Sequence, residues 1–310
     1  MTLPRLAISA VLLLLLLAAI TLWRDHTREA EAEAMFPPSG QFVTVDGFRV
    51  HYIMQGSGPD LVLIHGASGS LADFTFGLVG RLAKDYRVIA VDRPGLGHSD
   101  PIPDMSLAGQ ARVIKAAVAQ LGVTEPIVLG QSYGGAVALA WALEGGPRAL
   151  VLVSAPSLPW PGKLDIWYRL TSTAVGRAII IPLASAFVPQ SYVIAATKAV
   201  FAPDPVPDGY EGWIGTPLTL RRQTLAANMA QVNGLRAELV TMAPRYPSLT
   251  LPVELVHGSA DTIVPLAIHS LPLSKILPNV TLTVIDGAGH MPHHAHADVV
   301  IAAINRAALR

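Results

Sequence analysis

Cysteine is absent from the chain. Its absence excludes disulfide bonds, a catalytic thiolate and zinc held by cysteine, and it fits any redox compartment. Charged residues are also scarce, at 14% of the sequence, and balanced, with 22 Lys plus Arg against 22 Asp plus Glu. Because there is no surplus of positive charge, the composition gives no sign of a nucleic acid as partner.

Apolar residues, by contrast, make up 51% of the 310 positions. A chain this apolar is not disordered, and it is long enough for one large domain or for a domain with an insert.

One uncharged run, from Leu6 to Trp23, lies between Arg5 and Arg24. It is long enough to cross a membrane and longer than the apolar core of most cleaved signal peptides. We expect residues 1–40 to form a retained anchor plus a linker, because residues 24–39 are charged and then rich in proline and glycine. Cleavage near Ala32, giving a secreted or periplasmic protein, is the alternative.

The charges beside this run set its orientation poorly. Arg5 and the amino terminus on one side oppose Arg24 and Arg28 on the other. The expectation that the catalytic part lies outside the cytoplasm therefore rests on the resemblance of the run to a signal anchor.

Short runs of Val, Ile and Leu alternate with helical patterns through most of the chain. Asp46-Gly47 is a typical hairpin turn between the first two runs. An apolar stripe from Leu107 to Leu121 predicts a helix with Ser106 as its N-cap. The predicted strands are 41–45, 49–54, 61–64, 88–91, 127–129, 150–153, 253–256 and 282–285. This order predicts a doubly wound, mostly parallel eight-stranded α/β sheet, in which the six strands after the hairpin are buried on both faces.

Residues 157–248 interrupt this alternation. The segment contains no clear strand, is apolar and aromatic, and has helical patches broken by prolines. We expect a helical cap over the sheet, inserted between a first core part at 41–156 and a second at 249–310. A separate small helical domain with its own core is the other interpretation.

The strongest chemical signal is the motif Gly130-Gln131-Ser132-Tyr133-Gly134. It matches G-x-S-x-G, follows a predicted strand and precedes a helical run, which is the context in which this motif holds a nucleophilic serine. Small residues at Gly130 and Gly134 allow a sharp turn, so that the Ser132 side chain stands clear of the sheet. The helix N-terminus behind it favours developing negative charge.

A serine hydroxyl needs a base to act as a nucleophile, and the chain has ten histidines. His290 follows the last predicted strand, which puts it at the same carboxyl edge of the sheet as Ser132. His293, His294 and His296 are rivals, and we interpret them as ordinary loop or helix-start residues. The cluster also suggests a metal site, but cysteine is absent and carboxylates nearby are sparse, so we expect no metal.

Asp261 is the predicted acid because it follows the strand at 253–256. A carboxylate there can accept a hydrogen bond from the imidazole, fix its tautomer and stabilise the imidazolium. Asp286 is the rival, but it stands shortly before His290, which favours a role in a turn. No Asp or Glu directly follows the strand at 150–153, so that strand offers no alternative acid.

The oxyanion formed during acyl transfer needs backbone N–H donors. Tyr133, the residue after the nucleophile, offers one. The loop after the strand at 61–64 begins with His65-Gly66 and offers the second, with Ala67 as the best candidate. A simple glycine-rich turn is the competing interpretation of this loop.

The order of these motifs resembles the α/β-hydrolase superfamily across residues 41–310. The resemblance is carried by His65-Gly66, the loop of residues 92–99, the G-x-S-x-G turn, Asp261 and His290. The chain is most similar to the capped branch that includes epoxide hydrolases, haloalkane dehalogenases, carbon–carbon bond hydrolases and many esterases. The first two activities use an Asp nucleophile in that branch, so Ser132 argues against them.

We therefore expect a serine hydrolase without a cofactor that acts on small to medium apolar carboxylic esters through an acyl-enzyme. The apolar cap favours such substrates, although cap arginines could hold an acidic one instead; these are Arg169, Arg177, Arg221 and Arg222. Hydrolysis of a carbon–carbon bond, lactone or amide by the same triad remains open. So does a non-catalytic role in which a hydrolase scaffold binds a small ligand.

Overall fold

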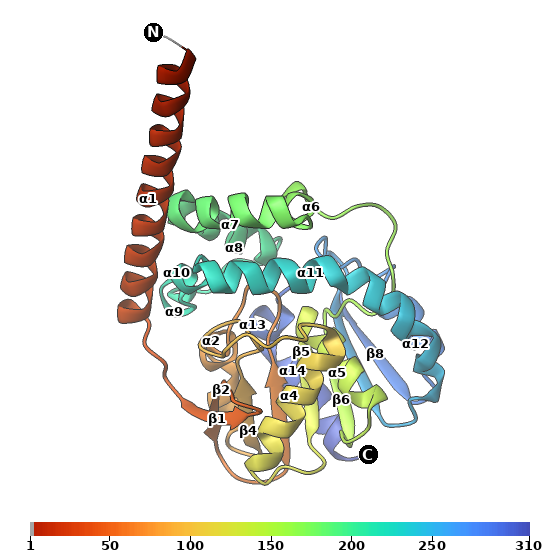
Figure 1. Ribbon diagram of the computed structural model, residues 1–310. Coiled ribbons are helices and arrows are strands. Elements are labelled where there is room, and N and C mark those ends of the chain that lie inside the picture. Colours follow the sequence, from red (N-terminus) through yellow and green to blue (C-terminus); the bar gives the residue numbers. More distant parts are fainter. Residues whose placement is uncertain (1–2) are drawn as a thin grey trace.

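A sheet of eight strands forms the centre of the computed structural model, which describes residues 3–310 (Figure 1). The strand order is β1-β2-β4-β3-β5-β6-β7-β8. β2 is antiparallel to both β1 and β4, and all other pairs are parallel. The strands are β1 (Gln41–Val45), β2 (Phe48–Gln55), β3 (Asp60–Ile64), β4 (Arg87–Val91), β5 (Ile127–Gln131), β6 (Ala149–Val153), β7 (Val253–Gly258) and β8 (Val280–Ile285). The predicted fold class is confirmed.

Helices cover both faces of the sheet because successive strand residues point in opposite directions. Val62 and Ile64 share one core with α4 and α5, whereas Leu61 and Leu63 share the other with α3 and α14. The predicted N-cap of α4 is confirmed, since Ser106 Oγ accepts a hydrogen bond from an N–H of the first turn at 3.0 Å. The helices of the core are α2 (Ala72–Thr75), α3 (Leu78–Leu82), α4 (Leu107–Gln120), α5 (Tyr133–Leu143), α12 (Ser270–Ile276), α13 (Pro292–Ala295) and α14 (Ala297–Ala308).

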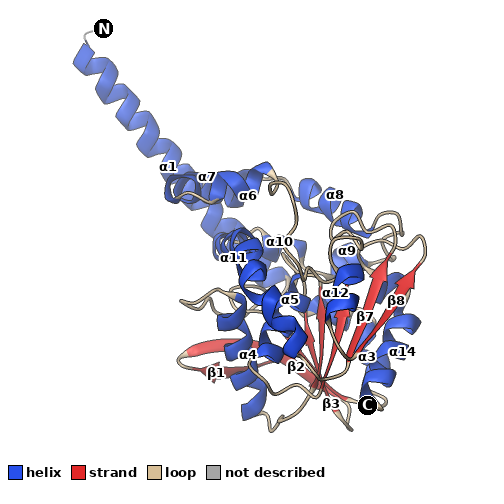
Figure 2. Cartoon of the chain, turned by 90° about the vertical axis from the view of Figure 1, so that its right-hand side faces the viewer, coloured by secondary structure: helices blue, strands red, loops and turns tan. Residues whose placement is uncertain are grey.

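Between β6 and β7 the described chain forms helices and loops. They are α6 (Ile166–Thr171), α7 (Ala174–Phe187), α8 (Gln190–Phe201), α9 (Tyr210–Trp213), α10 (Thr216–Thr219), α11 (Arg222–Met242) and the 3₁₀ helix Ala243–Ser248. In Figure 2 the arrowheads of β7 and β8 point toward the side where α8 and α9 lie. Val232, Leu235 and Leu239 of α11 belong to the same core as one face of the sheet. We therefore propose that residues 157–248 form a cap on a core made of 41–156 and 249–310.

Helix α1 (Leu3–Met35) is a single helix of 33 residues. The linker expected over residues 24–39 is wrong as far as Met35, because the Ala- and Glu-rich stretch has high helix propensity and continues the helix. Among the residues that the structure describes, α1 is the single helix long and apolar enough to cross a membrane. Its N-terminal half projects beyond the rest of the molecule (Figure 1).

The C-terminal half of α1 packs against the cap. Thr21, Asp25 and Ala32 are buried there. The Ser185 hydroxyl of α7 donates a hydrogen bond to the Asp25 carboxylate. Arg221 pairs with Glu33 of α1 at 2.9 Å. The helix is therefore part of the folded domain as well as a candidate membrane span.

Candidate active site

Ser132, His290 and Asp261 come together just beyond the carboxyl ends of β5, β8 and β7. Ser132 Oγ lies 2.9 Å from His290 Nε2, and His290 Nδ1 lies 2.7 Å from Asp261 Oδ2. An ionised carboxylate can only accept, so Nδ1 carries the ring proton and Nε2 can accept the serine proton. His290 and Asp261 are buried, whereas Ser132 is partly exposed. The structure thus brings the three residues chosen from the sequence into one hydrogen-bonded chain.

A strained turn presents Ser132. Its φ of 49° and ψ of −125° lie where residues other than glycine are rarely found. The turn is pinned because Ser132 N–H donates to Val153 O at 2.8 Å. It also needs close packing, since a Cβ on Gly134 would lie 2.1 Å from Ile64 O and one on Gly130 would lie 2.3 Å from Gly134 O. The strand, the strained serine and α5 together give the geometry that the G-x-S-x-G motif predicts.

Hydrogen bonds hold Asp261 ionised. Its Oδ1 accepts the backbone N–H groups of Ile263 and Val264, both at 2.9 Å, and His257 Nε2 lies 3.2 Å from Oδ2. Burial is the largest influence and raises the pKa of Asp261, but the hydrogen bonds from His257 and His290 outweigh it and lower that pKa below its usual value. Sequence reasoning missed His257, although its place at the end of β7 was a usable signal.

The rival acid, Asp286, lies away from this chain of hydrogen bonds. It is exposed, and its Oδ1 accepts a hydrogen bond from the Ser259 hydroxyl at 3.1 Å. The same hydroxyl oxygen accepts the N–H of Gly287 at 2.8 Å. These contacts close the turn after β8, which is the role that the sequence favoured.

The loop that carries Ala67 packs directly against Ser132. A Cβ on Gly66 would lie 2.4 Å from Gln131 Oε1 and 3.1 Å from Ser132 Cβ, so any larger residue there would force these side chains to shift. Ala67 is partly exposed beside it. Tyr133 is the first residue of α5, so its N–H is one of those that a helix leaves without an internal partner. The two predicted oxyanion donors therefore belong to backbone segments that flank Ser132.

His65 is neutral and holds the loop of residues 65–69 in place through hydrogen bonds at both ring nitrogens. Its Nδ1–H donates to Gly66 O, and its Nε2 accepts the N–H of Arg93, both at 2.9 Å. Burial, followed by the charge of Arg93, lowers the pKa of His65 to about 4. Both ring nitrogens are thus occupied, which suits the supporting role expected from the motif.

Arg93 also supports the loop, although the sequence assigned residues 92–99 only a structural role. Its fully buried guanidinium donates to His65 O and to Gly66 O, both at 2.9 Å. Gly66 O belongs to the same peptide unit as the N–H of Ala67, so the cation polarises the predicted oxyanion donor. Burial lowers the pKa of Arg93 to about 10, which leaves it cationic at neutral pH. The hydrogen bonds of Arg93 to the loop that carries the predicted oxyanion donor could not be deduced from one sequence.

Two cap residues contact the loops that carry the site. Asn228 Oδ1 accepts the N–H of Ser68 at 2.8 Å, beside the predicted oxyanion donor. Asp204 Oδ2 accepts the N–H of Gly289 at 2.7 Å, immediately before His290. The cap therefore helps to position both loops, and the sequence carried no signal of either contact.

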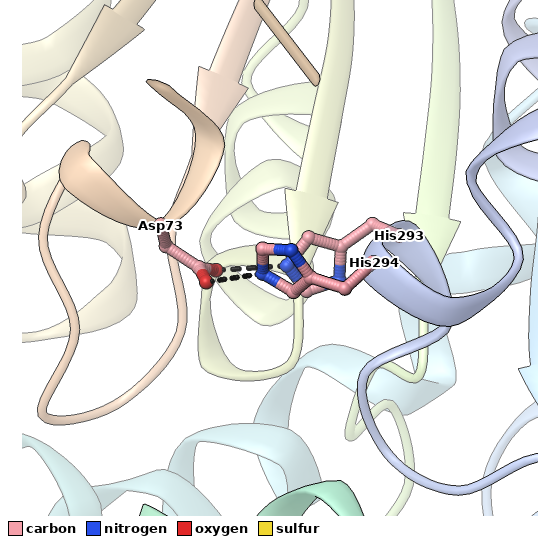
Figure 3. Close-up of side chains that lie close together, drawn as sticks. All are labelled: Asp73, His293 and His294. Carbon is pink, nitrogen blue, oxygen red and sulfur yellow. Dashed lines mark hydrogen bonds and ion pairs between the residues drawn. The ribbon is translucent and has the colours of Figure 1, made fainter. Parts of the chain in front are cut away.

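Two of the rival histidines, His293 and His294, form a second cluster with Asp73 (Figure 3). His293 Nε2 and His294 Nε2 lie 2.9 and 2.7 Å from the two carboxylate oxygens of Asp73, and Tyr210 OH donates to the same carboxylate at 2.7 Å. Burial raises the pKa of Asp73, but the two imidazoles outweigh it and hold that pKa well below its usual value. The expectation of sparse carboxylates is wrong, because α2 brings Asp73 from a distant part of the chain.

This cluster is the one group of the described residues with the composition of a metal site, since two imidazoles and a carboxylate suit Zn²⁺. In the structure these side chains are hydrogen-bonded to one another, and they connect α2, α13 and α9. Each Nε2 is aimed at its own carboxylate oxygen, and Tyr210 of the cap helix α9 takes a further position on Asp73. His296 lies apart from it, 3.4 Å from Asp204.

Comparisons with known proteins bear on this fold and site. A model described as "Alpha/beta hydrolase family" matches residues 61–303. The 2-hydroxymuconate semialdehyde hydrolase of Pseudomonas putida is 28% identical over an alignment of 273 positions that covers 84% of this chain and 91% of that relative. The crystal structure of an esterase from Rhodococcus sp. ECU1013 is 26% identical, with a TM-score of 0.68, and covers 87% of this chain and 98% of its own. A bacterial membrane phospholipase A shares the fold at 21% identity, with a TM-score of 0.63, over 98% of this chain and 99% of its own.

Proposed function

The chain belongs to the alpha/beta hydrolase family, and on that premise we propose that it is a serine hydrolase acting through Ser132, His290 and Asp261. The observation that carries the proposal is the hydrogen-bonded chain from Ser132 Oγ through both ring nitrogens of His290 to Asp261, with links of 2.9 and 2.7 Å. A base aligned with the hydroxyl and oriented by a carboxylate is the arrangement that activates a serine.

Each side chain has a defined task in the proposed reaction. Ser132 Oγ attacks the carbonyl carbon while its proton passes to His290 Nε2. The N–H groups of Ala67 and Tyr133 donate to the resulting oxyanion. His290 then gives the proton to the departing alcohol, which leaves an acyl-enzyme. Water attacks that ester with His290 again as base, and release of the acid restores Ser132.

We infer that the substrate is an apolar carboxylic ester of modest size. An esterase at 26% identity supports the bond type. Two of the four cap arginines already have partners within the protein, which supports an uncharged substrate. The buried Arg221 donates hydrogen bonds to Glu33 and to Gly97 O. Arg177 donates to Thr171 O and Ser172 O. The other two, Arg169 and Arg222, are exposed.

A second candidate is hydrolysis of a carbon–carbon bond beside a ketone. It is favoured by one observation, the 28% identity to a relative named for hydrolysis of 2-hydroxymuconate semialdehyde. The same triad would serve either reaction. A panel of p-nitrophenyl esters run beside a vinylogous diketone acid separates the two, because the better substrate identifies the bond.

A fluorophosphonate probe tests the chemistry directly. We expect it to label the wild-type chain at Ser132 and to leave Ser132→Ala unlabelled, with ester turnover in that variant reduced by several orders of magnitude. An unlabelled wild type would instead support a non-catalytic scaffold that binds a small ligand. Turnover of Ser132→Ala near that of wild type would show that the nucleophile is another residue.

We also propose that α1 is retained as a membrane anchor, with the catalytic part outside the cytoplasm. Cleavage after Ala32 would remove Asp25 and Arg28, which bond to Ser185 and Val188 O of the cap. A removable signal peptide would have no reason to be built into the fold in this way. N-terminal sequencing of the mature protein tests retention, and protease digestion of intact cells tests orientation.

A further inference from the structure

Helix α7 presents an apolar stripe on the outside of the cap. Val175, Ile179, Leu183 and Phe187 follow one another at steps of four, so they share one face of the helix, and each is 45–69% exposed. Single exposed apolar residues are common on proteins and need no explanation. A contiguous row of them marks a surface that contacts something.

Helix α6 extends the same surface. Ile166, Trp167 and Leu170 are 41–50% exposed, and α6 contacts α7. We call these three residues and the α7 stripe the cap face. The other exposed apolar side chains outside α1 are spread over several separate elements, such as Phe42 of β1 and Leu271 of α12.

The position of α7 on α1 places the cap face at the end of the apolar run. Arg24, the first charged residue after that run, donates from Nε to Ala186 O at 3.1 Å, and its guanidinium lies 5.1 Å from the centre of the Phe187 ring. One turn later, Arg28 donates to Val188 O at 2.8 Å. The C-terminal end of the stripe therefore lies level with the point where α1 changes from apolar to charged.

The direction of α7 suits a membrane surface rather than a membrane span. Figure 1 shows α7 running crosswise to α1, with α11 and the sheet on one side of it and the projecting half of α1 on the other. The 14 residues of α7 cover about 21 Å, which is short of the roughly 30 Å hydrocarbon core. The axis turns by 98° between α7 and α8, so the pair does not form one straight span either.

We propose that the cap face rests in the interfacial layer of the bilayer that α1 crosses, so that its occupant is the lipid surface itself. This inference depends on the retention of α1 proposed above. The charge beside the apolar residues fits, because Arg169 is exposed next to Leu170 and can meet anionic headgroups. Trp167 is the residue type that membrane interfaces favour. Esters dissolved in the bilayer are then the substrate class that the cap meets first.

Fluorescence quenching tests where the cap face lies. Because the chain contains no cysteine, Ile179→Cys in the full-length protein can carry a single environment-sensitive fluorophore. Leu271→Cys, at an exposed position on α12 and outside the cap face, is the matched control. In vesicles of phosphatidylcholine and phosphatidylglycerol, lipids spin-labelled near the headgroup should quench the label at 179 and not the label at 271.

Two results of that experiment would overturn the proposal. Equal quenching at the two positions would mean that the cap face has no preference for lipid. A blue-shifted label at 179 that lipid does not quench would mean that a second copy of the chain covers the surface. Neither result depends on Ser132, so the proposal and the proposed catalytic function fail separately.

Turnover gives an independent test. We expect Ile179→Asn with Leu183→Asn to hydrolyse a long-chain p-nitrophenyl ester carried in vesicles at least about tenfold more slowly, since losing one leucine-sized apolar contact changes an equilibrium by about that factor. Hydrolysis of dissolved p-nitrophenyl acetate should stay at the wild-type rate, and Leu271→Asn should match wild type on both. An equal loss on both substrates, or no loss on either, would contradict the proposal.

Discussion

Replacing Asp261 with asparagine exchanges one carboxylate oxygen for an NH2 group and leaves the shape of the side chain unchanged. The amide oxygen can still accept the two backbone N–H groups of Ile263 and Val264 that now bond to Oδ1. The NH2 group then takes the place of Oδ2, which lies 2.7 Å from His290 Nδ1. Two N–H donors cannot share that contact, so the imidazole must move its proton to Nε2.

The magnitude follows from this change of tautomer. With a proton on Nε2, His290 has no lone pair to accept the Ser132 proton across the 2.9 Å contact. The same swap in a serine protease costs about 10⁴ in kcat, which corresponds to about 5 kcal/mol of transition-state stabilisation. We expect a fall of that order in kcat/KM for Asp261→Asn. Asp286→Asn, which changes only an exposed turn, should stay within about twofold of wild type.

The assay is initial-rate hydrolysis of p-nitrophenyl acetate by wild type and both variants, with thermal unfolding measured on the same samples. Unfolding of Asp261→Asn near the wild-type temperature would show that the loss is chemical, because the retained backbone hydrogen bonds hold the loop in place. If Asp261→Asn keeps kcat/KM within tenfold of wild type, or if Asp286→Asn is the more damaged variant, the assignment of the acid is wrong.

Four further outcomes follow from contacts described above. His290→Ala should lose almost all turnover, whereas His293→Ala should mainly lower the unfolding temperature, because its partner is a structural carboxylate; rates and melting curves on both variants check this. Asn228→Ala should lower kcat more than it raises KM, since it frees the loop beside the oxyanion donor, and steady-state kinetics would show an unchanged kcat if that loop needs no support. The pKa of Asp73 in the folded protein lies below its unfolded value of about 3.9, so the ionised carboxylate stabilises the fold above that pH and the stabilisation is lost as pH falls. The difference in unfolding free energy between wild type and Asp73→Asn, measured by denaturant titration, should therefore shrink below about pH 4. Deleting residues 1–34 should give a less stable protein than deleting residues 1–20, since residues 21–34 pack on the cap, and equal melting temperatures would contradict that packing.

The sheet and the triad were predictable for a physical reason. The central strands β3 to β7 are buried on both faces and must be almost continuously apolar, so each left a visible run in the sequence. The edge strands β1 and β8 are more exposed. Residues directly after such runs must lie at one edge of a parallel sheet, which is why Ser132, Asp261 and His290 could be grouped without coordinates. The hydrogen bonds among them could then be predicted because a reactive serine needs a base and the base needs a carboxylate to orient it.

Contacts between helices left no comparable signal. The Ala- and Glu-rich composition of residues 24–35 was a usable signal for a helix, but the packing of that helix on α7 and α10 is seen only in the folded chain. Asp73 and His293 meet across 220 positions, and Ser68 and Asn228 across 160, with nothing periodic to link them. Cap helices have no strand register to restrict their placement, so these supports for the site became visible only with the structure.

Under the anchoring proposed above, the continuity of α1 (Leu3–Met35) would make it a rigid shaft between the bilayer and the rest of the domain. A helix advances about 1.5 Å and turns about 100° with each residue. One residue inserted after position 20 would therefore rotate the cap face by about 100° around the axis of this shaft and away from the membrane surface, while changing its distance from the bilayer by only about 1.5 Å. Seven inserted residues would nearly restore the direction and raise the whole domain by about 10 Å. The rotation of this helix about its axis, as much as its length, would then set which side of the domain faces the membrane in the proposed arrangement.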